Sequence, residues 1–146
     1  MDQLTAITAH TEYWSSVLEA DPVRPHISHW QRIAANRECF VIHEGIRVKS
    51  VLCCAYVGGV PIDEPTLFQQ WTNFSVVCFY SVWSFERGYG RQIINSAMSH
   101  IRWSRPEVYR AVTLSPKTEV AHKFHRANGA KLLQENPESL NFEYVI

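Results

Sequence analysis

A run of strand-forming residues that leads through two glycines into a helical pattern constrains the fold of this chain more than any other feature. Residues 73–83 are mostly β-branched or aromatic, and the turn Arg87-Gly88-Tyr89-Gly90-Arg91 comes soon after them. From residue 93 to residue 101, apolar side chains recur three and four positions apart, the spacing of one helix face. Such a unit directs free backbone N–H groups and the positive end of the helix dipole to one point, which glycines let an anion approach. The sequence therefore predicts a phosphate site at the start of this helix.

The remaining pattern predicts an α/β domain with a mixed, mainly antiparallel sheet flanked by helices. Residues 4–8 fit either a short strand or the lead-in to a helix, and residues 58–70 read as an exposed connection. Helices are expected near Tyr13–Leu18 and at 29–36, 88–104 and 115–128, and strands at 39–43, 46–57, 73–83, 108–114, 130–134 and 142–146. Ser115 is the expected N-cap of the last helix, and Gly129 its stop. The order is (β)-α-α-β-β-β-α-β-α-β-β in one domain over residues 1–146.

Length and composition describe a globular protein. The chain has 146 residues, 46% of them hydrophobic and 19% charged. The N-terminal residues lack the basic and apolar segments of a secretory signal, and no apolar run approaches the roughly 20 residues that span a bilayer. The four cysteines form no C-x-x-C pair and no zinc-like spacing with histidine, which favours buried, reduced thiols without a metal. We expect a cytoplasmic protein with no membrane partner.

Charge is distributed unevenly along the chain. The net charge is zero, but residues 87–131 hold nine basic and two acidic side chains, a local excess of +7. A basic half around a phosphate turn favours a small polyanionic ligand over extended nucleic acid, because a neutral protein lacks the broad field that attracts such a partner. Solvated helix faces are the alternative explanation for part of this charge.

The glycine turn and its flanking elements resemble motif A of the Gcn5-related N-acetyltransferases (GNATs), whose signature is Gln/Arg-x-x-Gly-x-Gly/Ala. The matching window is Phe-Glu-Arg-Gly-Tyr-Gly, residues 85–90, and Phe85 departs at the leading position. Downstream, residues 118–130 resemble motif B, commonly Asn-x-x-Ala-x-x-Leu-Tyr-x-x-x-Gly-Phe. Here Thr118 stands for Asn, His125 for Tyr and Ala130 for Phe. The resemblance spans roughly residues 38–146.

The resemblance implies acetyl-CoA as the co-substrate. In the family, the strand of motif A holds the pantetheine arm, and the backbone amides of the turn hold the pyrophosphate. Carried onto this sequence, the expected cofactor-binding residues are Tyr80, Ser81, Val82, Arg87, Gly88, Tyr89, Gly90, Arg91, Gln92 and Thr118. A glycine-tightened turn without a ligand is the alternative.

Catalysis by resemblance centres on His125, which stands where the family often has a tyrosine that acts as general acid. An imidazolium there would protonate the leaving thiolate. The alternative is a surface histidine on an amphipathic helix. Ser115 is a second candidate proton donor, although an N-cap role explains it.

The general base stays open, because residues 73–83 contain no Asp or Glu. Glu44, Asp63, Glu64 or a water relay are the candidates; Asp63 and Glu64 could equally attract a cationic substrate or lie in a solvated loop. The segment with His26 and His29 is expected to face the acceptor site, and Trp71 could line it.

The leading functional hypothesis is an acetyl-CoA-dependent N-acetyltransferase in which an amine attacks the thioester directly. The amine acceptor could be a protein lysine or N-terminus, a polyamine, a small amino compound or an aminoacyl-tRNA. The last is disfavoured, because the chain lacks both a basic excess and the motif B tyrosine. A non-catalytic acyl-CoA-binding or protein-interaction module is the alternative, and a nucleic-acid-binding domain a third. A homodimer is possible.

Overall fold

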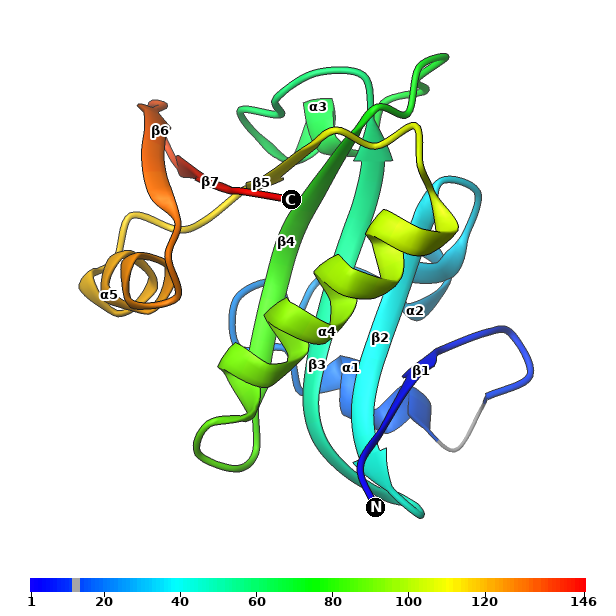
Figure 1. Ribbon diagram of the computed structural model, residues 1–146. Coiled ribbons are helices and arrows are strands. Elements are labelled where there is room, and N and C mark those ends of the chain that lie inside the picture. The colour runs from blue at the N-terminus through cyan, green and yellow to red at the C-terminus, as the bar shows by residue number, and fades with distance from the viewer. Residues whose placement is uncertain (12–13) are drawn as a thin grey trace.

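A seven-stranded sheet runs through the part of the chain that the computed structural model describes, residues 1–11 and 14–146 (Figure 1). Its spatial order is β1-β2-β3-β4-β5-β7-β6, and only the pair β4–β5 is parallel. The strands are β1 (Gln3–Ala6), β2 (Arg37–Glu44), β3 (Arg47–Val57), β4 (Val76–Ser84), β5 (Arg110–Thr113), β6 (Lys131–Glu135) and β7 (Leu140–Tyr144). The predicted mixed, mainly antiparallel sheet is confirmed.

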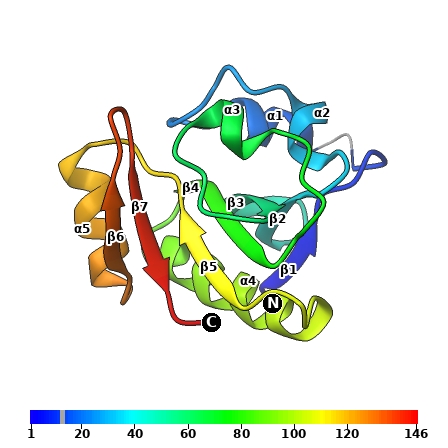
Figure 2. The same cartoon turned by 90° about the horizontal axis from the view of Figure 1, so that it is seen from above.

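Helices cover both faces of this sheet. They are α1 (Ser15–Glu19), α2 (His29–Ile33), α3 (Glu64–Leu67), α4 (Tyr89–Ser104) and α5 (Glu119–Ala127). Figure 2 shows α1, α2 and α3 on one side of the sheet, α4 on the other, and α5 beside β6. We call the side with the three short helices the α1–α3 face. The predicted element order is confirmed, except that the connection at 58–70 contains α3; the expected helix position Tyr13 lies outside the described residues.

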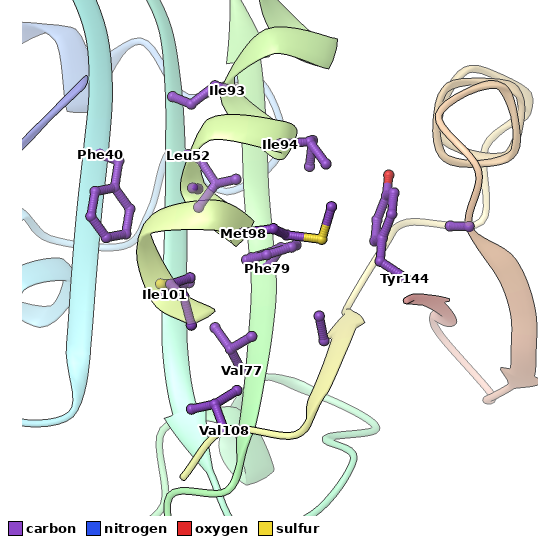
Figure 3. Packing of buried hydrophobic residues seen from close by; sticks show 14 of the residues in the cluster. Phe40, Leu52, Val77, Phe79, Ile93, Ile94, Met98, Ile101, Val108 and Tyr144 are labelled. Atoms are coloured by element: carbon purple, nitrogen blue, oxygen red, sulfur yellow. The ribbon is translucent and has the colours of Figure 1, made fainter. Parts of the chain in front are cut away.

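Two apolar clusters, one on each face of the sheet, form the core. Strand β3 contributes to both, because its neighbouring side chains point to opposite faces. Leu52 packs toward α4, whereas Val51 packs toward the α1–α3 face. In Figure 3 the apolar stripe of α4 lies over the strands, through Ile93, Ile94, Met98 and Ile101 against Phe40, Leu52, Val77 and Phe79. The helical spacing that the sequence shows at 93–101 is therefore the core face of α4.

Strands β4 and β5 run together for only four residue pairs and then separate. Their pairing ends at Phe79 opposite Thr113, and the last contact is the Leu114 amide donating to the Phe79 carbonyl at 3.1 Å. Strand β4 continues to Ser84 with β3 as its neighbour. The second half of β4 is therefore open on the side where β5 would have continued.

A β-bulge lies at the point of separation. Cys53 of β3 pairs with Ser81 and Cys54 with Phe79, so Tyr80 is the extra residue on β4. A bulge changes which side chains share a face of the strand. Tyr80 and Trp83 both pack in the cluster on the α1–α3 face, and Val82 packs toward α4.

The start of α5 differs from the prediction. The cap is Thr118, whose Oγ1 accepts from the Ala121 amide at 3.2 Å, and not Ser115. Ser115 instead extends the sheet, since its backbone exchanges two hydrogen bonds with Leu140. The predicted stop is confirmed, because Gly129 follows the helix with a φ of +96°. The four cysteines are buried and unbridged, as predicted.

Candidate active site

A cleft of about 440 Å³ lies where β4 separates from β5. Its walls come from the α1–α2 connection, the second half of β4, the segment that follows β5, and α5; they are Pro22, Val23, residues 79–84, Gly90, residues 114–116, Thr118, Val120, Ala121, Phe124 and His125. Six of the predicted site residues therefore border one cavity: Tyr80, Ser81, Val82, Gly90, Thr118 and His125. The remaining five, Arg87, Gly88, Tyr89, Arg91 and Gln92, lie outside the cleft wall, at the start of α4.

The turn before α4 has the backbone geometry of an anion site. Gly88 is the N-cap, with a φ of +89°, and a Cβ added there would meet no atom within 4 Å. The amides of Gly88, Gly90 and Arg91 have no acceptor within the described part of the chain, as expected of a helix start. The Gln92 amide is not free, because it donates to the Gly88 carbonyl at 3.2 Å. With the Arg87 amide, the predicted phosphate turn thus has four amides without a partner among the described residues.

Gly90 has a packing role in addition to the one expected. A Cβ at this position would lie 2.8 Å from Cε1 of Phe124, so the missing side chain makes room for the ring of α5. Nearby, Arg91 donates to Asn128 Oδ1 at 2.8 Å and to the Ala127 carbonyl at 2.6 Å. Gly90 and the Arg91 side chain therefore join α4 to α5, and only their amides face the turn.

The Tyr89 side chain also serves the fold. Its hydroxyl donates to Asp2 Oδ2 at 2.7 Å and lies 3.1 Å from Lys49 Nζ. Lys49 itself contacts Asp2 Oδ1 at 2.7 Å. The ring thus ties the glycine turn to β3 and the first residues of the chain.

Arg24 bridges the two separating strands, a role that no sequence pattern indicated. Its guanidinium donates to the Tyr80 carbonyl on β4 and, at 2.9 Å, to the Leu114 carbonyl just beyond β5. Its Nε lies 3.0 Å from Glu64 Oε1, and the side chain is 8% exposed. Arg24 therefore stabilises the opening from the α1–α3 face. The only sequence signal is a basic residue between Pro22 and Pro25.

A buried ion pair lies behind Arg24. Arg32 Nη1 contacts Asp21 Oδ2 at 2.8 Å, and both side chains are fully buried. Burial opposes the charge on Asp21, but Ser81, the Arg24 amide and Arg32 together hold the pKa of this carboxyl below its ordinary value. Ser81 Oγ lies beside the carboxylate without the geometry of a regular hydrogen bond. The Arg32–Asp21 ion pair is therefore a buried polar group next to Ser81 of β4, on the α1–α3 face of the sheet.

His125 is a buried, neutral ring in the cleft wall. It is 7% exposed, packs against Phe124 and Phe142, and its Nδ1 lies 2.7 Å from the Tyr144 hydroxyl. Burial lowers the pKa of the imidazole to about 4. The ring is therefore uncharged near neutral pH, unlike the imidazolium expected from the sequence, and it is not a surface histidine. Its catalytic role stays a prediction.

Because Thr118 and not Ser115 caps α5, the Ser115 hydroxyl is a stronger candidate for contact with substrate than the sequence indicated. It is 3% exposed, borders the cleft, and its Oγ lies 2.8 Å from Thr113 Oγ1. Thr113 Oγ1 also accepts from the Phe142 amide at 3.0 Å. A hydroxyl pair thus stands on the β5 side of the cleft, opposite β4.

The three candidate general bases, Glu44, Asp63 and Glu64, lie in different parts of the structure. Glu44 pairs with the N-terminal amine at 2.6 Å, and Asp63 caps α3, where bonds from Thr66 lower the pKa of its carboxyl. Glu64 contacts Arg24, which bridges β4 and β5, and lies 2.8 Å from His26. Neither Asp nor Glu occurs among the described residues that border the cleft.

The expectation that Trp71 lines the acceptor site is corrected. Trp71 does not border the cleft; its Nε1 donates to the Thr66 carbonyl, and its ring packs on Gly58. The connection before α2 does face the cleft, through Pro22 and Val23. Trp83 is the tryptophan among the described residues that border the cleft.

The described residues contain no group of three or more His, Cys, Asp or Glu side chains arranged to hold a metal ion. Within the same residues, no helix combines the length and the apolar character that crossing a membrane requires.

Several solved structures share the fold of this chain, whereas no protein-family model and no curated protein sequence matches it. The loading GNATL domain of CurA from Lyngbya majuscula superimposes with a TM-score of 0.73 at 11% identity, over 99% of this chain and 98% of that one. An acetyltransferase from Bacillus subtilis, solved in complex with CoA, gives 0.70 at 8% identity over 100% and 99%. The protein is therefore a small GNAT-fold protein, and the resemblance in fold is confirmed.

A second kind of structure shares the fold as part of a longer chain. Malonyl-CoA decarboxylase from Agrobacterium vitis gives a TM-score of 0.70 at 19% identity over 93% of this chain. The chain spans between 33% and 39% of the length of the malonyl-CoA decarboxylases that it matches. At these identities the likeness establishes the fold, and chemistry must be argued from the cleft.

Proposed function

We propose that this protein binds acetyl-CoA in the cleft between β4 and β5 and transfers the acetyl group to an amine. The observation that carries the proposal is the separation of β4 from β5 next to four amides, at the start of α4, that have no partner among the described residues. A pyrophosphate fits those amides, and an extended pantetheine arm fits the open edge of β4. The Bacillus subtilis protein of the same fold was solved with CoA, which supports this assignment.

In the proposed reaction, the free amine attacks the thioester carbonyl, the bond to sulfur breaks, and the thiolate leaves with a proton. The neutral His125 ring and the Ser115 hydroxyl both border the cleft and are the candidate groups that relay to the thiolate the proton that the attacking amine loses. The ammonium form of the acceptor must first lose a proton, and the Glu64–His26 pair, which contacts Arg24, is a candidate acceptor for it. The acceptor's identity, a homodimer and a cytoplasmic location stay predictions.

Calorimetry with acetyl-CoA, followed by CoA release in the presence of pooled amines, tests the proposal. We expect binding, and CoA release that depends on an amine. Binding without release under every amine tested would instead indicate the non-catalytic acyl-CoA-binding module. Failure to bind acetyl-CoA would contradict both.

A second candidate is decarboxylation of a malonyl-type thioester. It is favoured by the absence of Asp and Glu among the described residues of the cleft wall, because loss of CO₂ needs no base to deprotonate an amine. The malonyl-CoA decarboxylases also share 18–19% identity with this chain, against 8–14% for the named acetyltransferases of similar length. Conversion of malonyl-CoA to acetyl-CoA without an added acceptor would identify this activity.

A further inference from the structure

Two cysteine side chains lie in direct contact on the α1–α3 face of the sheet. Cys39 of β2 is the register partner of Cys53 of β3, and the Cys39 thiol donates to Cys53 Sγ at 3.1 Å. Both residues are fully buried, and both belong to the apolar cluster on that face. Neither residue borders the cleft, so the acetyl transfer proposed above does not use them.

The backbone at this pair has the spacing that a disulfide needs. The Cys39 carbonyl accepts from the Ile7 amide at 2.8 Å, so the backbone groups of Cys39 point to the β1 side and away from β3. In an antiparallel pair, such residues are the non-hydrogen-bonded ones, with Cα atoms about 4.5 Å apart. Disulfides join Cα atoms roughly 4.4–6.8 Å apart. Cys39 and Cys53 can therefore be joined by a bond without a shift of β2 against β3.

The surroundings make the two thiols unequal. Arg32 Nη1 donates to Cys53 Sγ at 3.4 Å. Burial opposes ionisation of Cys53, but the hydrogen bond from Cys39 and the positive charge of Arg32 hold the pKa of the Cys53 thiol below its ordinary value. Burial and the contact with Cys53 raise the pKa of Cys39. Because the thiolate is the nucleophilic form of cysteine, Cys53 is the sulfur that reacts first.

We propose that Cys39 and Cys53 form an oxidation site, at which hydrogen peroxide joins β2 to β3 by a reversible disulfide. In the first step the Cys53 thiolate attacks one peroxide oxygen, the O–O bond breaks, and hydroxide leaves and takes up the proton that the Cys53 thiol has lost. In the second step the Cys39 sulfur attacks the sulfenic sulfur of Cys53, the S–O bond breaks, and the Cys39 proton leaves with the oxygen as water. One peroxide is thus reduced to two waters, and a dithiol reductant reverses the bond.

Helix α2 contacts both thiols through Arg32, whose carbonyl lies 3.5 Å from Cys39 Sγ and whose guanidinium contacts Cys53. This helix has five residues, and a helix of that length depends on its cap and its tertiary contacts. The cap is Ser28, whose Oγ accepts from the Gln31 amide at 3.2 Å. Local unfolding of α2 therefore removes Arg32 from the pair and admits a small oxidant while β2 and β3 remain paired.

Mass spectrometry of the folded protein tests the site. The reduced protein is treated with hydrogen peroxide without denaturant, the peroxide is removed with catalase, and free thiols are then labelled with N-ethylmaleimide in urea. The untreated protein should take up four labels and the treated protein two, and digestion should yield two peptides linked through Cys39 and Cys53. Dithiothreitol should restore all four labels. Conversion of Met1, which is 96% exposed, to its sulfoxide shows that the peroxide was effective.

Single variants assign the bond. Neither Cys39→Ala nor Cys53→Ala should form a linked peptide. Cys78→Ala is the matched control, because Cys78 is buried in the same cluster, and this variant should still form the link between Cys39 and Cys53. Four labels retained in the parent protein at a peroxide dose that oxidises Met1 would overturn the inference. A link that involves Cys78 in place of either residue would do the same.

The rate of disulfide formation tests the route by which peroxide enters. Ser28→Ala removes the cap of α2 and should raise the rate severalfold, because local unfolding of α2 becomes easier. Asp63→Ala removes the equivalent cap of α3 and should leave the rate unchanged. Equal rates in the two variants would contradict entry by way of α2.

Stability supplies an independent measurement. The bond closes a loop of chain from Cys39 to Cys53, so the oxidised protein should unfold at a higher urea concentration than the reduced protein. Dithiothreitol should return the urea midpoint to that of the reduced protein, and peroxide should not raise the midpoint of Cys39→Ala. A midpoint that stays the same or falls on oxidation would show that the bond strains the two strands, against the geometry of the pair. The outcome does not depend on the proposed transfer reaction, because no CoA ester enters the test.

Discussion

The Phe124 ring occupies the space that a side chain at position 90 would need, because a Cβ on Gly90 would lie 2.8 Å from Phe124 Cε1. This contact joins the helix that carries the phosphate turn to the helix that carries His125. Phe124 also borders the cleft, so the same contact shapes the proposed CoA site.

Gly90→Ala should therefore destabilise the protein by roughly 1–3 kcal/mol, because the added methyl overpacks the α4–α5 contact. The free energy of unfolding from urea titration measures this. Gly59→Ala is the matched control, since its nearest atom, on Trp71, is 3.8 Å away. The smaller side chain of Phe124→Leu should restore part of the loss in the double variant. An unchanged urea midpoint in Gly90→Ala would show that α5 moves away from the added methyl group with no loss of stability.

Gly88→Ala tests the turn itself. Because an alanine is strained in the left-handed conformation of Gly88, the variant should lose roughly 1–2 kcal/mol in the free energy of unfolding. No neighbouring atom blocks the added methyl group. Gly45→Ala carries a similar strain, at a φ of +59° in the β2–β3 turn. Both variants should lose stability, but only Gly88→Ala should bind CoA more weakly by calorimetry. Equal CoA affinity in the two variants would argue against a pyrophosphate site at the start of α4.

Arg24→Gln should open the junction between β4 and β5. It leaves the carbonyls of Tyr80 and Leu114 without their charged donor, at an expected cost of roughly 1.5–3 kcal/mol. Arg126→Gln, on an exposed position of α5, is the control and should change little. Thermal unfolding and acetyl-CoA affinity should decline together in Arg24→Gln. If stability falls while affinity is kept, Arg24 supports the fold without shaping the cleft.

The cap of α5 distinguishes two neighbouring hydroxyls. Thr118→Ala removes the side chain that accepts from the Ala121 amide and should cost about 1 kcal/mol. Ser115→Ala removes no cap and should instead affect turnover, if its hydroxyl meets the substrate. Circular dichroism during urea unfolding, paired with CoA-release rates, separates the two effects. The prediction is wrong if Ser115→Ala is the variant that loses the helix.

His125 should make stability depend on pH in a defined window. Burial holds its pKa at about 4 in the folded protein, against an ordinary value of 6.5. Between these values the unfolded chain binds more protons, so the stabilising contribution is complete above about pH 6.5 and is lost as the pH falls toward 4. The loss amounts to about 3 kcal/mol for a shift of this size.

Urea unfolding at several pH values measures that slope. His125→Gln should flatten it, because glutamine does not titrate, and His10→Gln, at an exposed position, should leave it unchanged. A parent protein whose stability is constant from pH 6.5 to 4.5 would show that the His125 ring is accessible to water.

The local features of this fold are readable from the sequence. The helical spacing of Ile93, Ile94, Ala97, Met98 and Ile101 predicts α4 and its buried face, because periodicity records which side of a helix meets the core. Gly88 predicts the turn, since a left-handed conformation at a helix start favours glycine. Gly129 predicts the end of α5 for the same reason. Each signal involves residues within about one helical turn of one another.

The tertiary structure decided everything that depends on distant partners. Arg24 reaches residues 56 and 90 positions away, so no local pattern reveals that it bridges β4 and β5. The neutral state of His125 follows from burial beside Tyr144, and the role of Gly90 follows from a ring on another helix. The sequence alone thus determined where the glycine turn and α4 lie, because backbone geometry is a local property. Packing between distant segments determined which side chains border the cleft and in which charge state.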